Sequence, residues 1–213
     1  MTSKFFMSVL VPCSILLPIV IGLLKLQRLP ASARIIWYYL IVSAVVSAAF
    51  IFMGRKLHIN NMPLVHLYTP IEIIFFCWFY TKILWPEGNR FLNIWLPVLF
   101  TVLCIINALC FQSIYTYSSY TRSVEALICI ILALNYFARL AAESNEKKNI
   151  SKPELYFNSG IFLYFSAGFM LFVFSNFIIN SSHSNYAVIF VIYAALVLCM
   201  YLLFSMAFLL CKK

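Results

Sequence analysis

The chain has few charged residues and no aspartate. Only 10% of its 213 residues are charged, the six acidic residues are all glutamate, and 64% of the residues are apolar. A soluble domain is typically about 25% charged and 45–50% apolar. A water-soluble fold of this size does not bury so many apolar side chains. The composition therefore excludes a disordered chain, a disulfide-stapled secreted module and a soluble enzyme, and it predicts a protein embedded in lipid.

Seven apolar runs are long enough to cross a bilayer, which needs roughly 20 apolar residues. Backbone polar groups in lipid must bond within their own segment, so the runs are expected to be helices. The predicted spans are Phe6–Leu24, Arg34–Met53, Pro63–Leu84, Leu92–Phe111, Tyr120–Leu140, Tyr156–Asn180 and Tyr186–Leu210. The first run is too long for the apolar part of a signal peptide, and we expect an uncleaved helix. The sequence thus predicts an all-α polytopic membrane protein with a single seven-helix domain over residues 1–213.

The distribution of basic residues predicts the orientation of these spans. With the N-terminus outside, eleven Lys and Arg residues lie in inner segments and four lie on the outer side. Basic residues accumulate in short cytoplasmic connections, so we expect an outer N-terminus and a cytoplasmic C-terminus. The net charge of +9 is then a topology signal that also attracts anionic membrane lipid. No basic segment with stacking aromatics lies outside the spans, so no nucleic-acid partner is expected.

The seven cysteines form no C-x-x-C pair, and six of them lie within predicted spans. Free cysteines in such positions behave as small apolar residues. We therefore expect no disulfides, no metal site and no cofactor. P-loop, dinucleotide-binding and zinc-protease motifs are also missing. The last span has no lysine for a retinal Schiff base, and no internal repeat typical of transporters is visible.

Three charged residues lie well inside the predicted spans. Glu72 is about ten residues into its span, near the bilayer midplane, where a charge costs at least ~2.5–3.5 kcal/mol and needs a partner. Arg122 and Glu125 are three residues apart, a spacing that places them on one helix face, where they neutralise one another. His66 and Asn107 lie at a similar depth in the outer half. We therefore predict an outward-facing polar pocket that binds a ligand or proton.

Two tyrosines and a proline complete this prediction. Tyr68 lies between His66 and Glu72, and Tyr164 lies near the middle of its span. His66 and Glu72 are about 240° apart around an ideal helix. Pro70 removes a backbone hydrogen bond between them, and a kink there would bring His66 toward Glu72. Structural interpretations stay open: an interfacial hydrogen bond for His66, a helix clamp for Arg122 with Glu125, and a neutral hydrogen-bonded Glu72.

The runs Asn61–Glu72, Tyr120–Glu125 and Ile161–Gly168 resemble motifs of small, poorly characterised seven-span bacterial membrane proteins. Some of those proteins are similar to the membrane input domains of sensor histidine kinases. The resemblance implies a sensory role in the bacterial inner membrane. Because this chain has no kinase domain, it also implies a partner membrane or signalling protein. The segment Pro70–Phe76 also resembles a short motif of the membrane-bound lycopene cyclases. That family generally has a second acidic residue next to the one matched by Glu72, and this chain has Ile73 there.

Three functional hypotheses follow from these observations. The first is a sensory or regulatory protein in which Glu72 binds a small ligand or proton, with no catalytic residue assigned. The second is a proton- or cation-coupled transporter with Glu72 as the relay. The third is a membrane enzyme acting on an isoprenoid or lipid, with Glu72 as general acid. A purely structural subunit is a further alternative.

Overall fold

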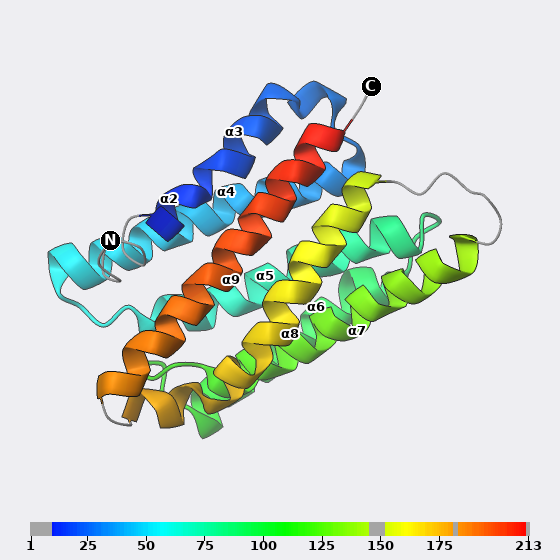
Figure 1. Cartoon of the computed structure of the whole chain (residues 1–213). Coiled ribbons are helices and arrows are strands. Elements are labelled where there is room, and N and C mark those ends of the chain that lie inside the picture. Colours follow the sequence, from blue (N-terminus) through cyan, green and yellow to red (C-terminus); the bar gives the residue numbers. More distant parts are fainter. Residues whose placement is uncertain (1–9, 145–151, 181–182, 212–213) are drawn as a thin grey trace.

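A computed structural model of the chain describes residues 10–144, 152–180 and 183–211. Every regular element in these ranges is helical (Figure 1). The longer elements are α4 (Ala31–Phe52), α5 (Met62–Leu84), α6 (Leu96–Ile106), α7 (Ser119–Ser144), α8 (Lys152–Asn180) and α9 (His183–Leu210). The shorter elements are α2 (Val11–Ser14), α3 (Leu16–Leu24), η2 (Leu26–Arg28), η3 (Met53–Leu57), η4 (Phe91–Trp95) and η5 (Asn107–Phe111). The all-helical fold class is therefore confirmed for the described residues.

Within the described residues, six helical segments are long and apolar enough to span a membrane: Ala31–Leu57, Met62–Leu84, Phe91–Phe111, Ser119–Ala142, Pro153–Ser175 and Val191–Leu210. The chain is thus built as a multi-pass membrane protein. The apolar helical stretch Val11–Leu24 is shorter and comes in two pieces, α2 and α3. At 1.5 Å per residue it is about 21 Å long, less than a bilayer core. The beginning of the predicted span Phe6–Leu24 lies outside the described residues.

The long helices lie side by side (Figure 1), and the contacts among α3, α4, α5, α7, α8 and α9 form a closed ring. Helix α5 packs against α4, α6 and α7, and α8 packs between α7 and α9. Helix α3 lies against both α9 and α4 and so closes the ring on that side. The indole Nε1 of Trp37 donates to the Ile19 carbonyl at 3.1 Å and joins α4 to α3. The interior of the ring is therefore lined by α4, α5, α7, α8 and α9.

Aromatic side chains fill one half of this interior. Phe76 on α5 meets Phe165 on α8 edge to face, with ring centroids 5.4 Å apart. Further along, Phe157 contacts Phe204 and Phe208 of α9 in the same manner. All five rings are fully buried. Edge-to-face pairs add about 0.5–1.5 kcal/mol each beyond the area they bury. Because Phe76 follows Glu72 by one helical turn, this packed half begins directly beneath the predicted polar pocket.

The helix carrying Glu72 is continuous. Helix α5 runs from Met62 to Leu84 through Pro70. The adjacent Thr69 hydroxyl donates to the Val65 carbonyl at 2.8 Å. Glu72 and the residues before Pro70 therefore belong to one helix.

Candidate functional site

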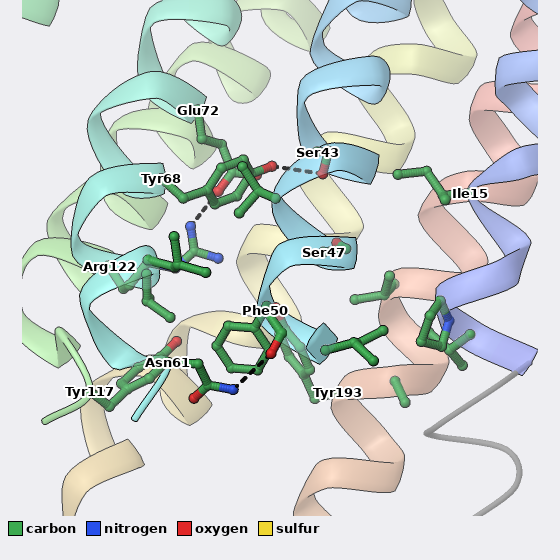
Figure 2. A pocket seen from close by; sticks show the side chains of 18 of the residues that line it. Ile15, Ser43, Ser47, Phe50, Asn61, Tyr68, Glu72, Tyr117, Arg122 and Tyr193 are labelled. Carbon is green, nitrogen blue, oxygen red and sulfur yellow. Dashed lines mark hydrogen bonds and ion pairs between the residues drawn. The ribbon is translucent and has the colours of Figure 1, made fainter. Parts of the chain in front are cut away.

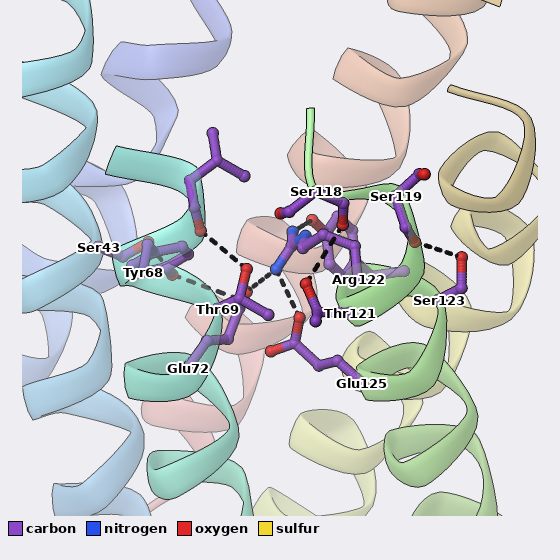
Figure 3. Close-up of polar contacts among 12 residues, drawn as sticks. Ser43, Tyr68, Thr69, Glu72, Ser118, Ser119, Thr121, Arg122, Ser123 and Glu125 are labelled. Atoms are coloured by element: carbon purple, nitrogen blue, oxygen red, sulfur yellow. Dashed lines mark hydrogen bonds and ion pairs between the residues drawn. The ribbon is translucent and has the colours of Figure 1, made fainter. Parts of the chain in front are cut away.

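Arg122 on α7 is the centre of the polar site. Its Nη1 atom donates to Glu72 Oε2 on α5 and to Glu125 Oε2 at 2.7 Å (Figure 3). Its Nη2 atom donates to the Tyr164 hydroxyl on α8 at 3.0 Å. Its guanidinium carbon lies 5.1 Å from the centre of the Phe172 ring, within cation–π range. A single side chain therefore connects α5, α7 and α8.

The charges of this cluster are withdrawn from solvent. Arg122 is 4% exposed, Glu72 is 2% exposed and Glu125 is fully buried. Two carboxylates face one guanidinium, so the fully ionised cluster carries one excess negative charge. An uncompensated charge is expensive in a low-dielectric interior. One proton or one cationic group would balance the cluster, and the arrangement is therefore suited to binding or titration.

Tyrosine hydroxyls surround the carboxylate of Glu72. Its Oε1 atom accepts from the Tyr39 hydroxyl at 2.7 Å and from the Tyr68 hydroxyl at 3.3 Å. Tyr68 also shares a hydrogen bond of 2.8 Å with the Ser43 hydroxyl on α4. Both oxygens of Glu72 thus have partners, because Oε2 accepts from Arg122. Donation to an ionised group strengthens such hydrogen bonds, and the network extends the site to α4.

Three buried polar atoms of this region have no hydrogen-bond partner among the described residues. They are Arg122 Nε, Glu125 Oε1 and Ser118 Oγ. Buried polar atoms are nearly always paired, since an unpaired one costs about 1–3 kcal/mol. The site therefore retains an unused donor and an unused acceptor next to its charges.

A cavity of about 670 Å³ extends from this cluster toward the connection between α4 and α5 (Figure 2). Glu72, Arg122 and several tyrosines line its floor, and Gly54 and Asn61 line its other end. Between them the walls are mostly apolar side chains of α4, α5, α8 and α9. Its volume lies in the range of about 300–1,000 Å³ typical of small-molecule sites.

Tyr117 lines the cavity from the connection that precedes α7. Burial raises the pKa of its phenol to about 12, and the positive charge of Arg122 acts in the opposite direction. Tyr117 is therefore protonated at neutral pH and presents a neutral hydroxyl to the cavity.

Five of the seven predicted site residues come together in the structure. Glu72, Arg122, Glu125, Tyr68 and Tyr164 belong to one hydrogen-bonded network. The predicted proximity of Arg122 and Glu125 on one helix face agrees with their ion pair, and Glu72 has the partner expected of a charge near the midplane.

The other two predicted residues lie outside this network. The His66 ring Nε2 lies 3.0 Å from the Thr116 carbonyl, and His66 does not line the cavity. The partners of Glu72 are Tyr39, Tyr68 and Arg122, so the expected approach of His66 to Glu72 is not observed. Asn107 is buried but donates to Gln112 Oε1 at 3.1 Å, and Gln112 donates to Ser119 at the start of α7. It therefore stabilises the α6–α7 connection.

The sequence prediction missed Tyr39, Tyr193 and Phe172. Tyr39 binds Glu72, Tyr193 shares a hydrogen bond of 2.7 Å with Tyr164, and Phe172 lies beneath the Arg122 guanidinium. The sequence does contain a signal for Tyr39. Polar residues occur every fourth position on this otherwise apolar helix and form a stripe of Tyr39, Ser43 and Ser47. All three line the cavity.

Among the described residues, no group of three or more His, Cys, Asp and Glu side chains is placed to hold a metal ion. Comparison of the chain with models of protein families, with curated proteins and with solved structures finds no match. The function is therefore argued from the geometry alone.

Proposed function

We propose that the chain is a sensory or regulatory protein of the bacterial inner membrane, responding to a small ligand or proton at the Glu72–Arg122–Glu125 cluster. In this proposal the chain has seven spans, an outer N-terminus and a cytoplasmic C-terminus. The basic residues concentrated in the segments assigned to the inner side support that orientation. The cavity then opens outward, since its mouth is formed at the connection between α4 and α5.

The observation that carries this proposal is the position of Arg122 between three helices at the floor of the cavity. It binds Glu72 on α5, Glu125 on its own helix α7 and Tyr164 on α8. A proton on either carboxylate, or a ligand that takes one of the Arg122 donors, weakens one of these connections. The three helices then shift relative to one another, and a partner protein at the inner face detects the shift.

Two features favour sensing over the alternatives. A transported ion needs a path to the other membrane face, but Phe76 and Phe165 close the interior directly beneath Glu72 and are fully buried. A general acid needs a carboxyl group free to reach its substrate, but both oxygens of Glu72 are engaged. A transporter or a lipid-directed enzyme would have to break these contacts first.

Intrinsic tryptophan fluorescence tests the proposal. None of the four tryptophans lines the cavity, and Trp37 joins α4 to α3, so a change in emission reports a helix movement and not a local change in the cavity. In nanodiscs, we expect a reversible change in emission when the pH is stepped between neutral and acidic values. Glu72→Gln should abolish the change, and Glu87→Gln, at an exposed loop position, should keep it.

A response of Glu72→Gln equal to that of the unsubstituted protein would overturn the proposal. Proton flux into proteoliposomes separates sensing from transport. Flux that depends on Glu72 would favour the transporter, and the proposal expects none above the protein-free background.

Sided labelling tests the orientation. We expect Ser144→Cys, at the end of α7, to react with a membrane-impermeant maleimide only from the cytoplasmic side. Asn60→Cys, at an exposed position between α4 and α5, should react only from outside. Both variants are made in a background that lacks the native exposed cysteines Cys13, Cys110 and Cys199. The reverse pattern would place the cavity mouth in the cytoplasm.

A further inference from the structure

The cavity has two chemically different parts. Its floor is polar, with Glu72, Arg122 and tyrosine hydroxyls. Its walls between the floor and the mouth are mostly hydrocarbon, from Val46, Phe50, Leu171 and Val197, and the lining next to Gly54 also contains Arg55. Along α5 the distance from Met62 at the mouth to Glu72 at the floor is ten residues, or about 15 Å. A molecule that fills this space has one polar end and an elongated apolar body.

The charges at the floor limit the polar end of such a molecule. An anionic group would be a third negative charge beside Glu72 and Glu125, which already share Arg122. A permanent cation would balance the cluster but would lie against the Arg122 guanidinium and leave its Nε donor unpaired. Charges are poorly tolerated in this desolvated space unless they are paired. An uncharged polar group avoids both problems.

The guanidinium at the floor specifies the polar group further. Arg122 lines the cavity, is 4% exposed, and carries N–H groups that donate hydrogen bonds. A hydroxyl or carbonyl oxygen accepts from such a donor, and a hydrogen bond to a charged group contributes about 1.5–3 kcal/mol. The neutral hydroxyl of Tyr117, which itself interacts with Arg122, also lies in the lining.

We propose that the ligand of this cavity is an uncharged amphiphile, with a hydroxyl or carbonyl oxygen at the Arg122 floor and a hydrocarbon body along the apolar walls. The inference rests on the proposed function, since it names the ligand class of the same site. The amphiphile enters at the α4–α5 end of the bundle, head first, and its oxygen accepts a hydrogen bond from the Arg122 guanidinium.

Three amphiphiles that share a dodecyl chain and differ in their head group test this assignment. The compounds are dodecanol, dodecanesulfonate and dodecyltrimethylammonium, whose head charges do not titrate. Each competes with tritiated dodecanol for the purified full chain in nanodiscs. We expect saturable binding of dodecanol and at least about tenfold weaker competition by both charged compounds, equivalent to about 1.4 kcal/mol.

Two matched variants locate the binding. Ser47 lines the cavity away from the charge cluster, and Ser47→Phe fills the apolar part. Val45 lies on the same helix but is 64% exposed and outside the cavity, so Val45→Phe is its control. We expect Ser47→Phe to weaken dodecanol binding at least about tenfold and Val45→Phe to change it less than about twofold. Arg122→Lys, which lacks the guanidinium, should weaken it by roughly tenfold.

The outcomes distinguish this inference from the proposed function. Non-saturable dodecanol uptake, or equal binding by Ser47→Phe and Val45→Phe, would overturn the inference. Equal competition by either charged compound would overturn the assignment of an uncharged head. If dodecanol binds as expected but neither acid nor dodecanol changes the tryptophan emission, the sensory function fails and the ligand assignment stands. If the acid response depends on Glu72 while dodecanol does not bind, the sensory function stands and the ligand assignment fails.

Discussion

Replacing Arg122 by methionine should destabilise the protein more than removing either carboxylate. The variant Arg122→Met leaves Glu72 and Glu125 as two buried like charges without their shared counter-ion. Removal of one partner from a buried ion pair costs about 3–5 kcal/mol. Protonation of the carboxyl groups limits the loss to this range. Either Glu72→Gln or Glu125→Gln leaves one carboxylate matched to one guanidinium, and we expect a smaller cost of about 1–2 kcal/mol.

The same reasoning predicts recovery when all three charges are removed. The triple variant Glu72→Gln, Arg122→Met, Glu125→Gln keeps an acceptor at position 72 for the hydroxyls of Tyr39 and Tyr68. Buried charged sets replaced by uncharged groups of similar volume are often neutral in stability. We expect the triple variant to be within about 2 kcal/mol of the unsubstituted protein and more stable than Arg122→Met alone.

Reversible unfolding in mixed micelles with increasing dodecyl sulfate, followed by circular dichroism, measures these differences. Lys56→Met removes an exposed cation and should change the free energy of unfolding by no more than about 0.5 kcal/mol. An Arg122→Met variant as stable as Lys56→Met would refute the reasoning. A triple variant less stable than Arg122→Met would refute it as well.

Three further predictions concern residues away from the cluster. Gly160→Ala places a Cβ atom 2.9 Å from the ring of Phe204 on α9, so we expect a loss of about 1–3 kcal/mol in the same unfolding assay; full stability would contradict the α8–α9 contact. Tyr80→Phe removes the buried donor to Asn158 Oδ1 at 2.8 Å and should cost about 1–2 kcal/mol, with no change in the acid response of tryptophan emission. Burial raises the pKa of the Cys211 thiol, so its alkylation in detergent should be slow at neutral pH and accelerate as the pH rises through the alkaline range; a pH-independent rate would contradict a buried thiol.

Helix positions were largely predictable because lipid leaves the backbone no other way to satisfy its hydrogen bonds. The residues at which the helices begin and end were less predictable. Helix α4 begins at Ala31, directly after Pro30, and not at Arg34, and a π-helical turn continues it beyond Met53 to Leu57. Such ends depend on local turn geometry, and hydropathy does not report it.

The level of the charged residues along their helices was predictable, but the direction of each side chain was not. Counting residues from the helix ends placed Glu72 and Arg122 at similar levels, and the two form an ion pair. Whether a side chain faces the ring interior depends on which neighbours surround its helix, and the sequence of one helix does not contain that information. His66 therefore has a different partner from the one expected, the Thr116 carbonyl. Tyr39 was missed because tyrosine at a membrane helix also serves as an interfacial residue.

The ion pair between Glu72 and Arg122 has a consequence for biosynthesis. The two residues are 50 positions apart, and chains grow at about 5–20 residues per second. Glu72 therefore leaves the ribosome roughly 3–10 s before its counter-ion exists. During that interval α5 meets the translocation machinery with an unpaired carboxyl group, a segment that inserts poorly as an anion. Insertion of α5 into lipid thus requires either that Glu72 takes up a proton or that α7 is synthesised first. The order of synthesis therefore affects how the site is assembled.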